Sequence, residues 1–134
     1  MLLAKKWQAH MCSSPAFALP PTLLVPVSSI VYDAYTTAEK AISTLVGFGM
    51  PPPTNASQQP PSVDSNASSQ PWGVAKLGYS WEALDVRAFS GTSESLAAAL
   101  EALVLQDGFF GDCVLVQRFV PALCELRLFV VDGR

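Results

Sequence analysis

Two charged side chains near the end of the chain, Glu125 and Arg127, are placed where they could do polar chemistry. Their segment is rich in Leu, Phe and Val, and side chains alternate along a β-strand, so both charges fall on one otherwise apolar face. A carboxylate in such a place can accept hydrogen bonds from hydroxyl groups. The alternative is an ion pair at the surface, which contributes at most about 1 kcal/mol.

A third charged residue, Lys76, lies in a short predicted strand. A lysine ammonium is a compact point charge suited to phosphate, and the alternative is a solvated lysine at the end of a strand. His10, the only histidine, has no Ser, Cys or carboxylate at triad spacing. The three cysteines, Cys12, Cys113 and Cys124, lack metal-ligand spacing. We therefore expect neither a catalytic triad nor a cysteine metal site.

The strands that must position these residues dominate the last part of the chain. Residues 113–120 and 125–131 are rich in β-branched and aromatic residues, and a short loop around Pro121 separates them. An Asp-Gly pair follows and predicts a hairpin turn, which implies a return strand. Because the sequence stops there, we expect a longer domain, with the strand 125–131 partly unpaired and prone to self-association.

Helices and strands are also expected along the rest of the chain. The clearest helix starts at Thr92 or Ser93, either of which can cap it, and carries Leu96, Leu100 and Leu103 at helical spacing. The other expected elements are a helix at residues 2–12, a strand at 23–27 with Pro26 at an edge or an end, a helix at 32–46, and paired strands at 72–77 and 85–89. Together they predict an α+β fold, a mostly antiparallel sheet with packed helices.

Composition divides the chain into three parts. Residues 50–71 are mostly Pro, Ser, Asn and Gln, bury too little apolar surface to offset their ordering entropy, and are predicted to be a disordered insertion. Residues 1–49 then form an N-terminal helix and strand segment, and residues 72–134 form the α+β subdomain. The net charge of −3 favours neither nucleic acid nor a membrane surface as partner, and no apolar run is long enough to span a membrane. We expect a cytoplasmic protein.

The order of these segments resembles the nucleotide-binding half of the ATP-grasp superfamily, enzymes that activate a carboxylate with ATP and commonly join it to an amine. Val74-Ala75-Lys76 resembles the strand whose lysine contacts ATP phosphate. Residues 114–121 resemble the strand and hinge that hold adenine, and residues 125–134 resemble the strand that follows. Near the N-terminus, Lys-Lys-Trp followed by Leu-Pro-Pro-Thr is similar to the family's entry segment. The resemblance covers most of the chain outside the Pro-rich tract and implies a partial ATP-grasp-like fold.

The resemblance also implies a set of site residues. Lys76 would contact phosphate, Glu125 would hold the ribose hydroxyls, and Arg127, the candidate catalytic residue, would lie near the phosphates or the acyl substrate. Either Lys5 or Lys6 would be the second, N-terminal lysine of the site. The adenine edge would be bound by the backbone of four consecutive residues, Gln117, Arg118, Phe119 and Val120.

Two departures from the family pattern limit what the resemblance implies. The loop after Lys76 carries Tyr79, Trp81 and Glu82 where the family is rich in Gly and Ser. The family's Mg²⁺-binding residues lie beyond the strand ending at Val131, so Mg²⁺ is expected only in a longer chain. The expected function is the ATP-binding portion of a carboxylate–amine ligase with an unknown carboxylate substrate, inactive as residues 1–134. The alternative is a non-catalytic remnant or a protein-interaction module that retains the sheet.

Overall fold

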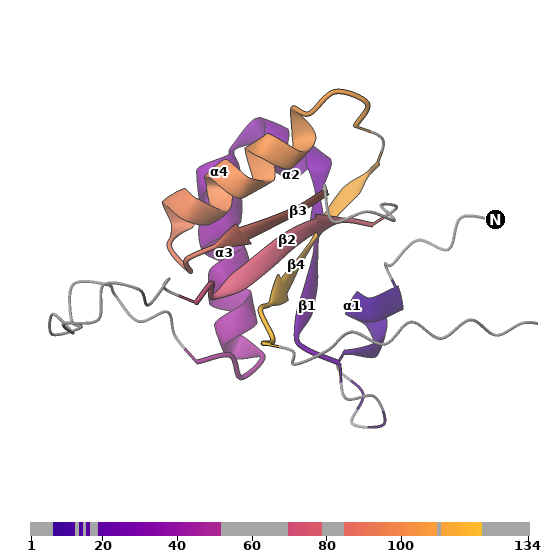
Figure 1. The fold of residues 1–134 in the computed structure, drawn as a ribbon, viewed down its shortest axis with the longest axis vertical. Coiled ribbons are helices and arrows are strands. Elements are labelled where there is room, and N and C mark those ends of the chain that lie inside the picture. The colour runs from indigo at the N-terminus through magenta and orange to yellow at the C-terminus, as the bar shows by residue number, and fades with distance from the viewer. Residues whose placement is uncertain are drawn as a thin grey trace, which may run out of the picture.

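The structure, a computed structural model, describes residues 7–12, 14, 16, 19–51, 70–78, 85–109 and 111–121. Within these ranges an antiparallel sheet of four strands is packed against helices (Figure 1). The predicted α+β class is therefore confirmed. The elements, in chain order, are α1 (Trp7–Met11), β1 (Thr22–Pro26), α2 (Val27–Tyr32), α3 (Ala34–Gly47), β2 (Gly73–Leu77), β3 (Val86–Phe89), α4 (Ser93–Val104) and β4 (Cys113–Arg118).

The strands do not follow one another in space as they do along the chain. Their order across the sheet is β1-β4-β2-β3, and every neighbouring pair is antiparallel. The connection from β1 to β2 contains α2 and α3, and the connection from β3 to β4 contains α4. Strand β4 thus enters between β1 and β2 and joins the first part of the chain to the later part.

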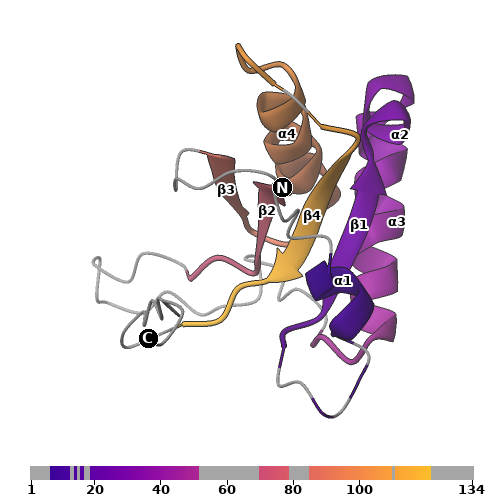
Figure 2. The same ribbon diagram turned by 90° about the vertical axis from the view of Figure 1, so that its right-hand side faces the viewer.

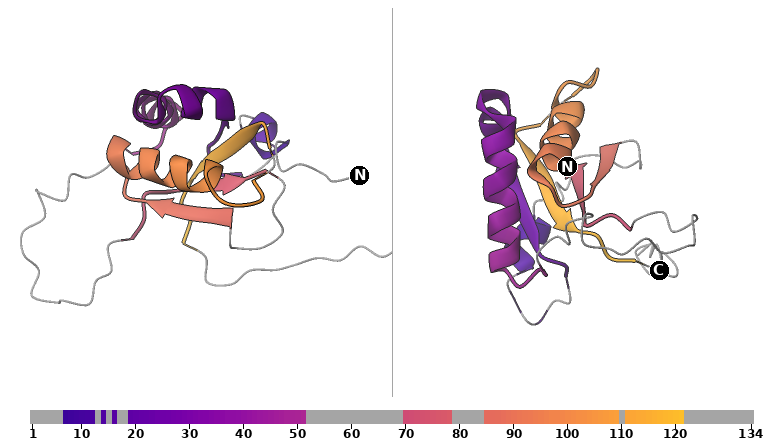
Figure 3. Two further views of the ribbon diagram at one scale, coloured as in Figure 1. Left: turned by 90° about the horizontal axis from the view of Figure 1, so that it is seen from above. Right: turned by 90° about the vertical axis from the view of Figure 1, so that its left-hand side faces the viewer.

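The two faces of the sheet carry different residues. Helices α2, α3 and α4 lie on one side of it (Figures 2 and 3), and the strand residues that face them form the core, namely Val25, Ala75, Leu77, Phe89, Val114 and Val116. Because side chains alternate along a strand, the residues between these point the other way. We call this second side the opposite face; its residues include Thr22, Leu24, Val74, Lys76, Leu115 and Gln117.

Two helices that cover the core match their predicted patterns. In α4, Leu96, Leu100 and Leu103 are fully buried, and the Thr92 side chain accepts a hydrogen bond from the Ser95 N–H at 3.2 Å. In α3, the buried residues are Ala34, Ala38, Ala41, Ile42 and Leu45, which recur at helical spacing. The predicted pairing of the strands near 72–77 and 85–89 is also confirmed, since β2 and β3 are hydrogen-bonded neighbours.

The region after β1 differs from its prediction. A strand was expected to reach Val27 and a helix to begin at Tyr32, but residues Val27–Tyr32 form the separate helix α2. This segment is rich in Val, Ile and Ser, which disfavour a helix locally. Burial of Ile30, which is 3% exposed, stabilises the helix despite the low helix propensity of these residues. Extended Asp33 then separates α2 from α3.

Some expectations lie outside the described residues. They include most of the Pro-rich tract, the strand 125–131 with its hairpin turn, and the first half of the N-terminal helix, of which Trp7–Met11 is described. The division of the chain at residues 49 and 72 stays a prediction, although β1 and β4 belong to one sheet. Among the helices that the structure describes, none has the length and apolar character needed to cross a membrane.

Replacing Gly73 by Ala is expected to destabilise the fold. Gly73 lies between Phe89 of β3 and Arg118 of β4. A Cβ there would overlap the Phe89 ring, which is 2% exposed and has little room to move, and would lie 3.0 Å from the Gln117 carbonyl oxygen. Overpacking of this kind costs about 1 to 3 kcal/mol. Urea unfolding of Gly73→Ala measures the loss in free energy of unfolding.

The matched control is Gly47→Ala, at the end of α3. A Cβ at Gly47 would meet no atom within 4 Å, and alanine favours a helix over glycine. Its free energy of unfolding should stay the same or rise by up to about 1 kcal/mol. Equal unfolding curves for the two variants would contradict the close approach of β2 to β3.

Candidate functional site

Lys76 projects from β2 onto the opposite face. Its Cα pairs with that of Leu115 on β4, and Gln117 lies two residues further along β4 on the same face. The half-buried lysine side chain reaches diagonally to this residue, and its Nζ donates a hydrogen bond to Gln117 Oε1 at 2.7 Å. The predicted phosphate lysine and the first residue of the predicted hinge are therefore in direct contact.

The same amide continues the hydrogen bonding to a third strand. Gln117 Nε2 donates to Thr22 Oγ1 of β1 at 2.9 Å, and Thr22 Oγ1 donates to the Pro20 carbonyl oxygen at 2.9 Å. Thr22 is 2% exposed and Gln117 is 8% exposed. The Lys76–Gln117–Thr22 chain thus crosses β2, β4 and β1, with each side chain hydrogen-bonded to the next.

Sequence reasoning did not find Thr22, nor the role of the Gln117 side chain. Gln117 was expected to act through its backbone alone, and Thr22 is 95 residues from it along the chain. The available signal was weak: Gln117 is a polar residue in a run of Leu and Val, and Thr22 directly precedes such a run. A polar residue in a strand that is otherwise apolar usually has a partner when it is buried.

The backbone of the predicted hinge is partly occupied by the sheet. The Arg118 N–H donates to the Pro21 carbonyl at 3.2 Å, and the Phe119 N–H donates to the Trp72 carbonyl at 3.2 Å. The alternation of an antiparallel ladder directs the Gln117 N–H toward β2 as well. Of the four predicted hinge residues, Val120 is the one whose N–H lies past these bonds, and its side chain is 54% exposed.

Trp72 holds the hinge in place from the β2 side. Its ring meets the Phe89 ring edge-on with centroids 5.7 Å apart, and its Nε1 donates to the Pro51 carbonyl at 3.0 Å. Because its own carbonyl accepts the Phe119 N–H, the position of the indole is coupled to that of the hinge. Trp72 thus packs against the core and also fixes the end of β4.

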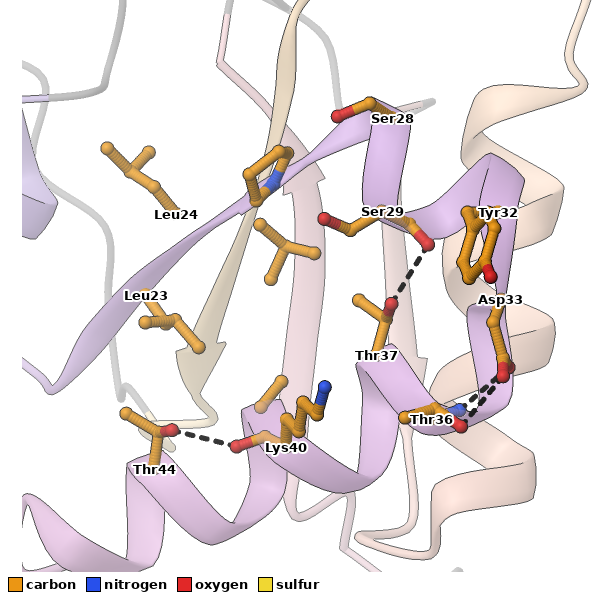
Figure 4. A pocket seen from close by; sticks show the side chains of 13 residues that line it. Leu23, Leu24, Ser28, Ser29, Tyr32, Asp33, Thr36, Thr37, Lys40 and Thr44 are labelled. Carbon is orange, nitrogen blue, oxygen red and sulfur yellow. Dashed lines mark hydrogen bonds between the residues drawn. The ribbon is translucent and has the colours of Figure 1, made fainter.

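A groove of about 570 Å³ lies elsewhere, between β1 and the helices α2 and α3 (Figure 4). Several of its hydroxyl groups are used within the protein. Thr37 Oγ1 donates to the Ser29 carbonyl at 2.9 Å, and Thr44 Oγ1 donates to the Lys40 carbonyl at 2.8 Å. Of the predicted site residues that the structure describes, none lines this groove. A second cavity, of about 590 Å³, lies beside α1 and is lined by Cys12 and Thr22 among others.

Asp33 at the rim of the groove caps α3. Its carboxylate accepts hydrogen bonds from the Thr36 N–H at 2.9 Å and from Thr36 Oγ1 at 2.7 Å. The backbone hydrogen bond, and then the hydroxyl, lower the pKa of the Asp33 carboxyl because both stabilise its charged form. Asp33 is therefore a helix cap, and its carboxylate at the groove is already hydrogen-bonded within the protein.

The remaining predicted site residues, Lys5, Lys6, Glu125 and Arg127, lie outside the described residues. Within the described ranges, no three His, Cys, Asp or Glu side chains come together as metal ligands. The expected roles of these residues and the requirement for Mg²⁺ stay predictions. The part of the site that can be described is the Lys76–Gln117–Thr22 chain with the hinge beside it.

Comparison of the chain with protein-family models, with curated proteins and with solved structures gave no significant match.

The Asp33 cap predicts a pH dependence of stability. Its pKa is lower in the folded state than in the unfolded state, so the stabilisation is present above the unfolded value near 3.8 and is lost as the pH falls through the folded value. The wild type should therefore unfold at higher urea than Asp33→Asn at pH 6, and the difference should shrink below about pH 4. Asp107→Asn, which removes a carboxylate from the turn after α4 and not from a helix N-cap, is the control. A gap that persists unchanged at pH 2.5 would contradict the capping role.

Proposed function

We propose that this chain binds ATP across β2 and β4, as the nucleotide-binding portion of an ATP-grasp-type carboxylate–amine ligase. The observation that carries the proposal is the contact between Lys76 Nζ and Gln117 Oε1. It brings the lysine of the Val74-Ala75-Lys76 motif next to the hinge motif, although the two are 41 residues apart along the chain. In the resemblance these two motifs hold the phosphate and the adenine of one nucleotide, and β2 and β4, which carry them, are neighbours.

The phosphate end of the proposed site is Lys76. An ammonium group on a half-buried strand offers a point charge to a phosphate oxygen, and Gln117 orients that group through a neutral amide. The Gln117 amide accepts from the ammonium and carries no charge of its own. This arrangement suits recognition of an anion better than a carboxylate in the place of Gln117 would.

The adenine end of the proposed site is the last part of the hinge. The sheet uses the N–H groups of Arg118 and Phe119, so the Val120 N–H is the donor that we assign to the adenine edge. From Gln117 to Val120 an extended chain covers about 10 Å. A nucleotide can span this separation, with its base at Val120 and its phosphates toward Lys76. The exposed Val120 side chain leaves this end accessible.

A second candidate function is protein interaction without catalysis, in which the sheet serves as a scaffold. It is favoured by large apolar side chains that are exposed around α2 and the start of α3: Val31 at 72%, Tyr32 at 92% and Tyr35 at 50%. Exposed apolar patches often mark binding surfaces. This candidate does not account for the buried polar contacts on the opposite face, so we rank it second.

The substrate, the location and the self-association of the protein are also proposed. A ligase of this type acts on a carboxylate substrate, which the described residues do not identify. We propose a cytoplasmic location; the thiol of Cys12 is free, and disulfides are rare in that compartment. Self-association through the segment 125–131 also stays a proposal.

Replacing Lys76 by Ala should weaken ATP binding. A hydrogen bond to a charged group contributes about 1.5 to 3 kcal/mol, so the dissociation constant should rise roughly tenfold or more. Isothermal titration with ATP and Mg²⁺ measures it. Lys40→Ala is the matched control, because Lys40 is a residue of α3 that lines the groove, away from the hinge.

Two outcomes would count against ATP binding at this site. One is the same dissociation constant for the Lys76→Ala and Lys40→Ala chains. The other is a wild-type chain that, at millimolar ATP, gives no binding heat and no shift of any resonance, including those of the Val120 and Phe119 amides. The interaction module would be favoured if the wild type does not bind ATP and instead captures a protein partner, and if Tyr32→Ser abolishes that capture.

A further inference from the structure

We propose that Thr22 is a positioning residue for Lys76, and that it acts through the orientation of the Gln117 side-chain amide. The carbonyl and amino ends of that amide have opposite hydrogen-bonding roles. Whichever end faces Lys76 decides whether the ammonium meets an acceptor or a donor. Thr22 sets this choice from the far side of Gln117, on another strand. The binding consequence rests on the proposed function, whereas the effect on Lys76 itself does not.

The direction of the hydrogen bonds follows from the Thr22 hydroxyl. It has one hydrogen, which it donates to the Pro20 carbonyl at 2.9 Å. Its oxygen is then left to accept, and it accepts from Gln117 Nε2 at 2.9 Å. Gln117 Oε1 is thereby turned to Lys76 Nζ, 2.7 Å away. Lys76 thus donates to Gln117, Gln117 donates to Thr22, and Thr22 donates to the Pro20 carbonyl.

Burial makes the alternative orientation costly. With Thr22 at 2% and Gln117 at 8% exposure, little water can replace a lost partner. A flipped amide would point its NH₂ group at the lysine ammonium, which has no acceptor to offer. It would also require the Thr22 hydroxyl to leave the Pro20 carbonyl. Both changes are unfavourable in a region of low dielectric, so the observed orientation is held.

The backbone around Thr22 is itself fixed, which makes it a firm anchor. The Pro21 carbonyl accepts the Arg118 N–H at 3.2 Å, and the Thr22 carbonyl accepts a hydrogen bond from Cys12 Sγ at 3.4 Å. Prolines at 20 and 21 restrict the chain that enters β1. The N-terminal segment is thus coupled to the lysine on β2 through one side chain of β4.

The test compares Thr22→Val, which removes the hydroxyl at nearly constant volume, with Thr22→Ser, which keeps it. The first readout is the Nζ resonance of Lys76 in chains labelled with ¹⁵N-lysine, assigned with Lys76→Arg. Thr22→Val should shift and broaden this resonance, and Thr22→Ser should restore it. Thr44→Val is the control, because that exposed hydroxyl donates to the Lys40 carbonyl within α3.

The second readout is the ATP dissociation constant in the same set of chains. Loss of one orienting hydrogen bond of about 0.5 to 1.5 kcal/mol predicts a rise of roughly two- to tenfold for Thr22→Val, reversed in Thr22→Ser. If the wild type does not bind ATP while the Lys76 resonance responds as expected, the proposed function fails and the positioning role stands. An unchanged Lys76 resonance in Thr22→Val overturns the positioning role. So does a Thr22→Ser chain that behaves like Thr22→Val.

A substitution of Gln117, the middle residue of the Lys76–Gln117–Thr22 chain, tests the proposal if Thr22→Val does not fold. Gln117→Met retains the length of the side chain and removes the amide. It should move the Lys76 resonance at least as far as Thr22→Val, with the far-ultraviolet circular dichroism of the wild type. A folded Gln117→Met chain with the wild-type Lys76 resonance would overturn the proposal.

Discussion

The insertion of β4 between β1 and β2 is the constraint on which the described structure depends. Val114, Leu115 and Val116 are fully buried, so this strand contributes apolar side chains to both faces of the sheet. Strand β1 has its ladder to β4 and none to β2 or β3 within the described residues. Removing β4 would leave the N-terminal strand β1 without its ladder to the rest of the sheet.

This insertion also assembles the candidate site. Lys76, Gln117 and Thr22 come from three different strands, and they meet because β4 places Gln117 between the other two. Burial of Thr22 and Gln117 beside the half-buried Lys76 is acceptable here because each finds a hydrogen-bond partner. The fold and the site therefore share one cause, and a change that displaces β4 would damage both.

The topology implies a particular difficulty in folding. The contact between Gln117 and Thr22 closes a separation of 95 residues, and the β1–β4 ladder depends on the same long-range pairing. Contacts of this kind form late, because the entropy of closing a long loop must be met before they stabilise the chain. Helices α3 and α4, by contrast, carry their own local signals and caps. We expect the helices to gain structure before the sheet is complete.

Sequence alone was sufficient for the elements with strong local signals. The Thr92 cap, the Leu96, Leu100 and Leu103 spacing of α4, the alanine-rich buried stripe of α3 and the β2–β3 pair were all predicted. These depend on contacts between residues close along the chain, which is where periodicity and capping rules apply. The identity of Lys76 as a candidate also came from its local motif.

Tertiary structure decided the rest. Residues Val27–Tyr32 form a helix against their β-branched composition because Ile30 is buried in the core. The order β1-β4-β2-β3 could not be read from the chain, since the pattern of a strand identifies its buried face and not its neighbour. Thr22 therefore carried only a weak signal as part of a site. Its hydroxyl gains a role only when a strand from the other end of the described chain brings Gln117 beside it.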